Sequence, residues 1–281
     1  MSAPPRLGGQ ALIEGVMVRA GGRWAAAARR PDGEIVTTEE DVPAWALAGR
    51  RLPVVRGVVA LAATIGLGMK ALSWSRSVAE EEPTPRGSVL AATALSIVVF
   101  VSVFALVPAA VARLVAGGGL GFAVAEAVTR VALFVGYVWA IGRLPGIRRT
   151  FEYHGAEHKA IAAQEAGDEL SVARVASYSP LHARCGTDFL VLVAVVAIAA
   201  FALVSPASWL LLAASRVLLL PVVAGVAYEV LRVSDRPAAA RWLKPLMAPG
   251  LAVQRLTTRA PSDDQVEVAV VAVRRALAGA G

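Results

Sequence analysis

Apolar blocks alternate with short polar stretches along this chain. Four blocks are rich in Val, Leu and Ala and nearly free of charge: residues 87–112, 120–141, 189–204 and 209–228. A helix needs about 20 apolar residues to cross the hydrocarbon core of a bilayer, and these blocks lie near that length. Turn residues at Gly117–Gly119 and Ser205–Pro206 separate the two members of each pair. The pattern predicts two transmembrane hairpins, in segments 87–142 and 189–230.

The segment 51–86 is apolar over a shorter distance. The run between Arg56 and Lys70 is too short to cross a bilayer. We therefore expect an amphipathic or re-entrant helix at the inner surface, with basic side chains facing anionic head groups. Pro83 and Pro85 end it as a linker.

Residues 1–50 have the signature of a small β-rich region. Turn signals at Gly21–Gly22 and Pro31–Gly33 separate stretches rich in small, β-branched and aromatic residues. We expect a meander of three short strands, over Gln10–Arg19, Trp24–Arg29 and Ile35–Thr38. No apolar core of a signal peptide precedes them, so no cleaved leader is expected.

The C-terminal segment 231–281 is basic and interrupted by Pro245 and Pro249. Ser262 followed by two aspartates predicts a helix start, because a serine N-cap and acids in the first turn both stabilise that end. Residues Gln265–Leu277 then have apolar positions at helical spacing and should dock on the rest of the molecule.

Composition and charge agree with a membrane protein. The 281 residues are 57% apolar and 17% charged, with a net charge of +7. No compact basic cluster with interleaved aromatics suggests nucleic acid, so we assign the charge to topology. The inferred outer turns, Gly117–Gly121 and Ser205–Ser208, lack Lys and Arg, which places both termini in the cytoplasm. The single cysteine excludes an intrachain disulfide.

The predicted fold class is an α-helical membrane protein with about four transmembrane helices, a small N-terminal β region and cytoplasmic helical segments. The predicted location is the inner (cytoplasmic) membrane, with multiple passes. The expected partners are the lipid bilayer and a second copy of the chain, and no nucleic acid; the substrate stays open.

Three charges fall inside the predicted spans. Glu126 and Arg130 are four residues apart and share a helix face, so they can neutralise one another. Arg216 lies at a similar depth in the last span and competes for Glu126. Charges within a membrane mark a candidate functional site, and a structural pin between helices explains them equally well.

All three histidines and the only cysteine lie in the polar segment 143–188. His154 and His158 form H-x-x-E-H with Glu157, and the i,i+4 spacing projects both imidazoles from one helix face. This order of residues is used by inverzincins, in which the Glu activates a water molecule. His182 and Cys185 follow in H-x-x-C spacing. We expect a divalent metal, zinc being the best match to nitrogen and sulfur ligands.

Several ligand sets fit this segment. The three histidines can bind the metal, with Glu157 as the catalytic base. Cys185 can be a fourth ligand and close a structural site, or it can replace His182. A third reading makes Cys185 a nucleophile, with His182 as base and Arg184 favouring the thiolate. The simplest reading is a histidine pair hydrogen-bonded to loop backbone. Glu229, at the inner end of the last span, and Glu14, in the β region, are candidate supporting residues.

At these motifs the sequence resembles the YqhQ family, bacterial membrane proteins grouped as domain of unknown function 1385. The matching stretches are GGQALIEGVMVR, LPVVRGV, YHGAEHK, HARCGTDFL, AYEVLR and PGLAVQRLTTRAPSDDQVEVA. The resemblance covers almost the whole chain and implies a metal-dependent enzyme. It also implies that further polar residues join the same cytoplasmic assembly: Glu14, Arg19, Arg56, Gln254, Thr257, Thr258 and Arg259.

Two functions follow as hypotheses. The first is a membrane-bound metal-dependent hydrolase. The second is a non-enzymatic scaffold or transporter-like protein, in which the polar segment is held by a structural metal or by hydrogen bonds alone. An open coordination position favours the first, and a closed Cys/His site favours the second.

Overall fold

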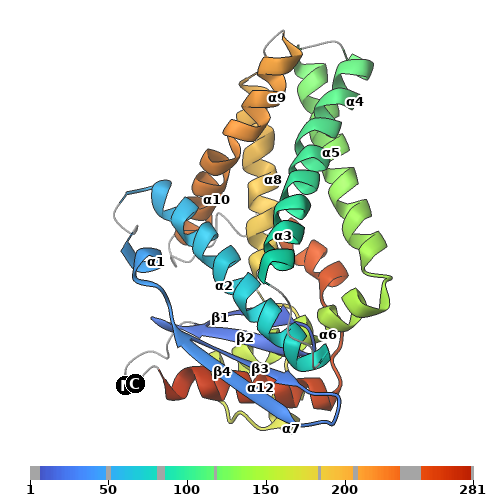
Figure 1. The fold of residues 1–281 in the computed structure, drawn as a ribbon. Helices are drawn as coiled ribbons and strands as arrows, with labels where there is room; N and C mark the ends of the chain where they lie inside the picture. Colours follow the sequence, from blue (N-terminus) through green and yellow to red (C-terminus); the bar gives the residue numbers. More distant parts are fainter. Residues whose placement is uncertain are drawn as a thin grey trace.

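The computed structural model describes residues 7–48, 52–80, 86–116, 119–182, 185–204, 208–234 and 248–279. Arg184, and residues 117–118 and 205–207 of the two predicted outer turns, lie outside these residues. A sheet and its covering helices form one end of the molecule, and a tower of apolar helices rises from it (Figure 1).

The N-terminal region forms an antiparallel sheet of four strands in the order β1-β2-β3-β4. The strands are β1 Leu7–Leu12, β2 Gly15–Ala20, β3 Arg23–Arg29 and β4 Ile35–Asp41. The prediction of one strand over Gln10–Arg19 is wrong, because the chain reverses at Ile13 and Glu14 and pairs Leu12 with Gly15. Glu14 has a positive φ of 51°, which few non-glycine residues adopt.

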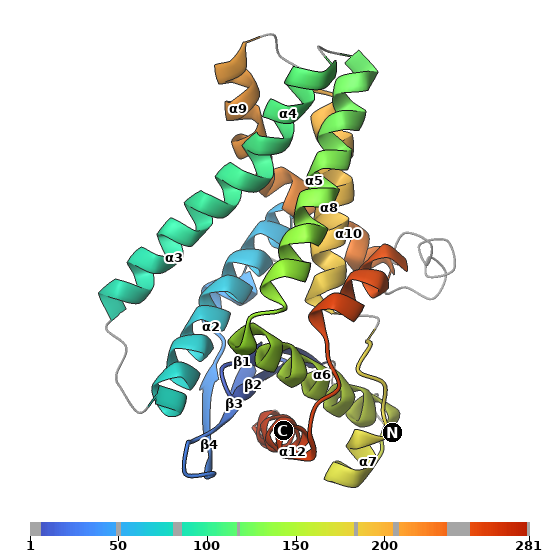
Figure 2. The same cartoon turned by 90° about the vertical axis from the view of Figure 1, so that its right-hand side faces the viewer.

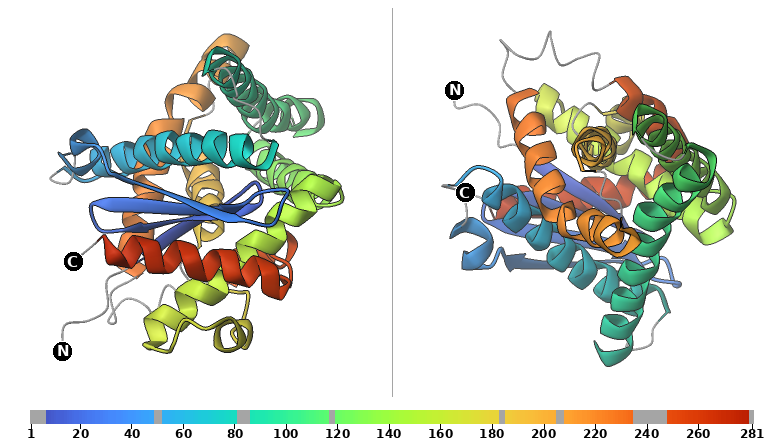
Figure 3. Two further views of the ribbon diagram at one scale, coloured as in Figure 1. Left: turned by 60° about the horizontal axis from the view of Figure 1, so that its bottom comes forward. Right: turned by 90° about the horizontal axis from the view of Figure 1, so that it is seen from above.

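Both faces of the sheet are covered, as expected from strands whose successive side chains alternate between faces. Val16, Val18 and Ala27 pack against α6 (Pro145–Ala166), α7 (Val172–Ala176) and α12 (Asp263–Ala278). Met17 and Trp24 face the other way, toward α2 (Val55–Glu80). Figure 3 shows α2 and α12 on opposite sides of the sheet. The short helix α1 (Ala44–Ala48) follows β4.

Helix α2 lies within the segment 51–86, where a helix followed by a linker was predicted. The apolar run judged too short to cross a membrane lies within a helix of 26 residues, one of four that are long and apolar enough for a span by length and composition. Its central residues Ala63, Leu67 and Ala71 are buried against the sheet. Small residues bring its first turns close to α10, where a Cβ on Gly57 would lie 2.8 Å from the Cα of Gly225.

The first predicted span is an almost continuous helical rod. It comprises α3 (Arg86–Val101), the π-helical turn η1 (Ser102–Leu106) and α4 (Val107–Ala116). Its partner in the predicted hairpin is α5 (Gly119–Ile141). Figure 2 shows α3 inclined away from α5 and α8, while α4 lies beside α5. The window Leu90–Ala116 and helix α5 are two further candidate spans.

The second predicted hairpin differs in detail. Helix α8 (Gly186–Ala202) covers the predicted span 189–204, but it is shorter than the four candidate spans. The last span is α9 (Trp209–Leu218) followed by α10 (Leu220–Ser234), which together give the candidate Trp209–Val233. The apolar helices are thus compatible with a multi-pass membrane protein.

The C-terminal helix matches its prediction. Helix α12 begins after Ser262 as N-cap, and the Ser262 backbone N–H donates to Oε1 of Gln265 at 2.9 Å. Its buried valines and alanines complete the core beneath the sheet. A further helical stretch, residues 248–257, precedes it.

Candidate functional site

Helix α6 carries the histidines and fixes their direction. Pro145 occupies its first turn, and Gly167 ends it in the left-handed conformation with φ 74°. Ala156, Ala160 and Ala163 bury one face against the sheet and α12. The helical repeat therefore presents the residues at 154, 158, 161 and 165 along another face.

Three ligand atoms come together on this side of α6. One atom each from His154, His158 and Cys185 lie within 4.8 Å of one another. His154 Nε2 is 3.2 Å from Cys185 Sγ, and the two imidazole centroids are 4.3 Å apart. Cys185 is the residue before α8, so its contact with His154 brings the start of α8 next to α6.

Backbone carbonyls orient both imidazoles. His154 Nδ1 lies 2.9 Å from the carbonyl oxygen of Thr257, and His158 Nδ1 lies 2.6 Å from that of Pro180. Because a carbonyl oxygen only accepts, each Nδ1 carries the hydrogen and each Nε2 presents a lone pair. His158 Nε2 is buried and has no hydrogen-bond partner among the described residues. This is how metal-binding histidines are commonly held.

Glu157 is buried beside the histidines. Burial raises the pKa of its carboxyl group to about 7, and the His154 imidazole opposes that rise. Its Oε2 has no partner among the described residues. Gly9 in β1 makes room for this carboxylate, because a Cβ on Gly9 would lie 2.4 Å from Glu157 Oε1. The acid is therefore wedged between α6 and the edge of the sheet.

His182 lies near the cluster but is not one of its three members. Its ring centroid is 5.8 Å from that of His158, and its Nε2 is 3.1 Å from Glu165 Oε2. Its backbone N–H donates to Gln254 Oε1 at 3.1 Å. The structure thus brings Cys185, and not His182, together with the two α6 histidines.

A cavity of about 450 Å³ opens at the cluster. Its walls come from β1, α2, α6 and the residues around the start of α8. Lining residues include Gly8, Gly9, Gln10, Thr64, His154, Glu157, His158, His182 and Cys185. This is large enough for part of a substrate, and polar side chains converge on one of its walls.

The segment 254–259 supports the site from behind. Thr257 supplies the carbonyl that orients His154, and Gln254 Nε2 donates to the His182 carbonyl oxygen at 2.9 Å. Arg259 contributes its backbone: its N–H donates to the Phe151 carbonyl at 3.0 Å. Thr258 Oγ1 donates to the Gln254 carbonyl at 2.5 Å. Thr257 orients the candidate ligand His154 directly, the other three support neighbouring residues, and none of the four lines the cavity.

Other predicted supporting residues lie elsewhere. Glu14 binds Arg149 through Nη2 at 2.5 Å and accepts from the Tyr153 hydroxyl at 3.2 Å, so it anchors the first turns of α6 to the sheet. Glu229 accepts from Arg56 Nε at 2.6 Å and joins α10 to α2. Arg184 falls outside the described residues.

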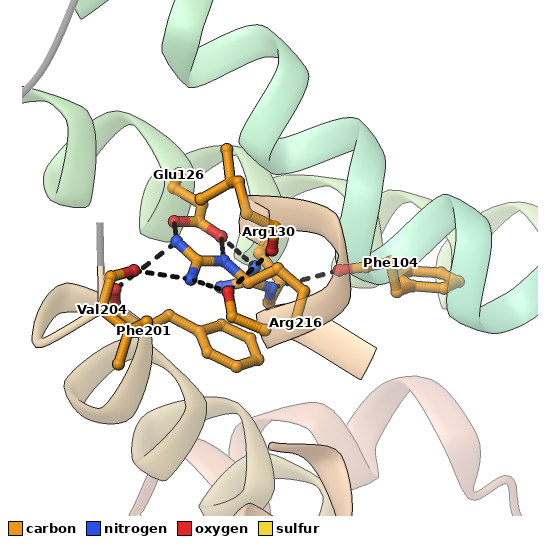
Figure 4. Close-up of polar contacts among 8 residues, drawn as sticks. Phe104, Glu126, Arg130, Phe201, Val204 and Arg216 are labelled. Atoms are coloured by element: carbon orange, nitrogen blue, oxygen red, sulfur yellow. Dashed lines mark hydrogen bonds and ion pairs between the residues drawn. The ribbon is translucent and has the colours of Figure 1, made fainter. Parts of the chain in front are cut away.

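The three charges within the apolar helices form a second, separate cluster (Figure 4). Glu126 accepts two hydrogen bonds from Arg216 at 2.8 Å each and one from Arg130 at 2.6 Å. Arg216 Nη1 also donates to the Val204 carbonyl, and Arg130 Nε donates to the Phe104 carbonyl. Both guanidinium groups lie within 4.8 Å of the Phe201 ring centroid. The cluster joins η1, α5, α8 and α9.

Sequence reasoning missed three parts of the site. Glu165 is eleven residues after His154 and shares its helix face, so helical spacing alone predicts its place. Asp188, buried, accepts from Gln254 Nε2 at 3.0 Å. Gly9 and its neighbours in β1 carried no chemical signal, because their contribution is backbone and space.

Comparison with known proteins gives two matches. A sequence model of the family described as Protein of unknown function (DUF1385) matches residues 52–279. The protein named Uncharacterized protein YqhQ of Bacillus subtilis (strain 168) is 33% identical over 289 residues, covering 95% of this chain and 91% of that protein. No solved structure matches the chain. The family match includes α6, Cys185 and the segment 254–259.

Proposed function

Because the chain belongs to this family, whose description states no function, we propose from the site itself that it is a membrane-bound, metal-dependent hydrolase. The observation that carries the proposal is the convergence of His154, His158 and Cys185 at a cavity that the buried Glu157 also lines. Three protein ligands leave one position of a tetrahedral zinc ion for water, which is the arrangement of catalytic zinc sites.

The residues suit zinc both in ligand type and in the orientation of their ligand atoms. Both histidines present Nε2 because their Nδ1 atoms donate to carbonyls, and the His158 Nε2 has no other partner among the described residues. A thiolate and two imidazoles are ligands that zinc accepts. Zinc held there would act as a Lewis acid toward water and toward the electrophilic centre of a substrate.

Glu157 has the properties of a general base. A base works best when its pKa lies near the working pH, and burial raises the pKa of this carboxyl to about 7. In the proposed role, Glu157 takes a proton from the attacking water and returns it to the leaving group. His182, which pairs with Glu165, also lines the cavity and can contact substrate there.

The proposal includes a location and partners for the protein. The sheet end of the molecule, which holds the site, lies at the cytoplasmic surface of the inner membrane, and the apolar helices contact the bilayer. We still predict that the protein pairs with a second copy of itself and that it does not bind nucleic acid.

Metal content tests the proposal directly. Full-length protein, purified in detergent and loaded with zinc, should retain a single equivalent after dialysis, and a His154→Ala/His158→Ala variant should retain none. His182→Ala is the matched control, because this imidazole pairs with Glu165, and it should keep its zinc. Glu157→Gln should keep zinc as well. Equal, negligible zinc in wild type and the double variant would end the proposal.

The second hypothesis, a scaffold or transporter-like protein, has one observation in its favour. The Glu126 cluster holds two guanidinium groups and one carboxylate inside the apolar tower. Charges at such a place are often functional. However, Glu126 accepts from both arginines, and the cluster joins η1, α5, α8 and α9, which equally suits a structural clamp. Tight zinc binding without hydrolysis of any substrate class would favour this second hypothesis.

A further inference from the structure

The free edge of the sheet forms one wall of the cavity. Strand β1 is at the end of the strand order and pairs only with β2 among the strands that the structure describes. Five consecutive residues of β1, from Leu7 to Ala11, line the same cavity as His154 and Glu157. The other walls come from α2 on one face of the sheet and α6 on the opposite face. The cavity therefore lies alongside the strand edge.

The hydrogen-bond pattern shows which backbone groups face the cavity. The Arg29 N–H donates to the Glu14 carbonyl at 2.8 Å, so the backbone of Glu14 bonds toward β3. The N–H and C=O groups of the next residue, Gly15, therefore point the other way, toward Leu12 in β1. Alternate residues of an antiparallel strand bond to opposite sides. Leu12, Gln10 and Gly8 therefore bond to β2. The N–H and C=O groups of Gly9 and Ala11 point outward along the cavity.

The edge is accessible where it meets the chemistry. Gly8 and Gly9 are both exposed, and neither has a side chain to cover the backbone. The Glu157 carboxylate packs directly against Gly9. Protein sheets normally protect a free edge with charges, proline or a covering segment, because it will pair with another extended chain. Two exposed glycines beside the buried Glu157 give this edge none of that protection.

We propose that β1 binds an extended polypeptide as an added fifth strand, so that the substrate class of this site is the peptide bond. This inference rests on the proposed hydrolase function. Main-chain pairing with an exposed edge is an established way to hold a peptide with little dependence on its sequence. A peptide paired with Gly9 and Ala11 passes Glu157 and the His154, His158 and Cys185 cluster in an extended form. In the reaction, water adds to the peptide carbonyl, the C–N bond breaks, and Glu157 transfers the proton of that water to the leaving amine.

The first experiment places a photocrosslinker on each edge of the sheet. Zinc-loaded, full-length Glu157→Gln protein carries p-benzoylphenylalanine at Gly8 or, as the matched control, at exposed Thr37 in the opposite edge strand β4. The probe is the oxidised B chain of insulin, an unstructured polypeptide. Irradiation should crosslink the probe at position 8 and not at position 37. Equal yields at the two positions, or no crosslink at either, would overturn the inference.

The second experiment reads the backbone pairing itself. Synthetic peptides covering the crosslinked part of the probe are N-methylated at one amide at a time. Only every second amide of an added strand bonds to β1, so methylation should weaken binding by about threefold to tenfold at alternate positions and little between them. An effect without alternation would mean that side chains alone are recognised, and the inference would fail.

Zinc content measured on the same samples separates this inference from the proposed function. Zinc binding without peptide pairing would leave a hydrolase of another substrate class, for example of amphiphiles reaching the site from the apolar groove that Leu61 and Phe189 help to line. Peptide binding that alternates along the strand, in protein that binds no zinc, would support peptide pairing with β1 and overturn the proposed hydrolase function.

Discussion

Gly155 lies where α6 and the segment before α12 touch. A Cβ at this position would be 2.0 Å from the backbone carbonyl oxygen of Arg259, which cannot move without displacing the segment that orients His154. The residue between the two motif histidines is thus selected by packing, and the same contact places Thr257 next to the imidazole.

The first prediction concerns this contact. Gly155→Ala should destabilise the protein by about 1–3 kcal/mol, because overpacking against backbone forces local rearrangement. Gly146→Ala in the same helix is the control: a Cβ there has no atom within 4 Å, and alanine is the better helix former by up to about 1 kcal/mol. Thermal unfolding of both purified variants measures the difference. Equal melting temperatures would show that the close contact does not exist.

At this scale the sequence predicted that His154 and His158 share a helix face, because residues four apart in a helix do so. It named Glu157 and Cys185 as candidates because they lie in the same polar segment as the histidines. It did not predict their orientation. The carbonyl that holds His154 is 103 residues away in sequence, and the one that holds His158 is in a loop. Such contacts depend on backbone position, for which residue type carries little information.

Among the elements, long periodic segments were predictable and short irregular ones were not. Helix α12 and its Ser262 cap match the prediction, because cap chemistry and apolar spacing agree there. The hairpin at Ile13–Glu14 was missed, since neither of its two turn residues is glycine or asparagine and only Gly15 follows them. Helix α2 was predicted within its segment, but its length as a possible membrane span was underestimated, because only the apolar run Arg56–Lys70 was compared with the bilayer.

The connection between α6 and α7 gives a prediction about pH. Asp168 accepts from the Tyr178 hydroxyl at 2.5 Å and from Arg174 Nε at 2.6 Å, and these two bonds hold the pKa of its carboxyl below the usual 3.8. A depressed folded-state pKa stabilises the fold above pH 3.8, and the gain is lost as the pH falls through the lower value.

Asp168→Asn should therefore melt at a lower temperature than wild type at about pH 7, and the gap should narrow as the pH falls below 3.8. Tyr178→Phe, which removes one of the two donors, should show a smaller gap with the same dependence. Melting curves across this pH range, recorded in one detergent, give the comparison. A gap that does not change with pH would exclude the carboxylate as its source.

The Glu126 cluster links elements within the apolar tower. Removing the carboxylate leaves two guanidinium groups buried without a countercharge, and breaking such a pair costs about 3–5 kcal/mol. Glu126→Gln should thus strongly reduce the melting temperature and yield. Glu80→Gln removes an exposed i,i+4 pair with Arg76 and should change stability by less than about 1 kcal/mol. Similar stability of both variants would mean that the cluster does not clamp η1, α5, α8 and α9.

For the whole molecule, the separation of the sheet end, which holds the candidate site, from the tower of apolar helices has a consequence for membrane topology. The sheet, α6, α7 and α12 share a core at one end, with Arg148 and Arg149 at the start of α6 on that side. Figure 1 places the end of α4 and the start of α5 at the other end of the tower. Basic residues concentrate on the cytoplasmic side of membrane proteins. Under the proposed topology, substrate and metal would reach a site at the sheet end from the cytoplasm.

Reporter fusions test this orientation. Alkaline phosphatase, which folds only outside the cytoplasm, should be active when inserted after Ala116 and inactive when fused to Gly281. Green fluorescent protein should give the opposite result at the same two positions. Both fusions must be compared at equal expression, measured by immunoblot. Phosphatase activity at Gly281 would put the His154 cluster on the outer side, where an oxidising environment would compete for the Cys185 thiol and the proposed zinc site would lose its physical basis.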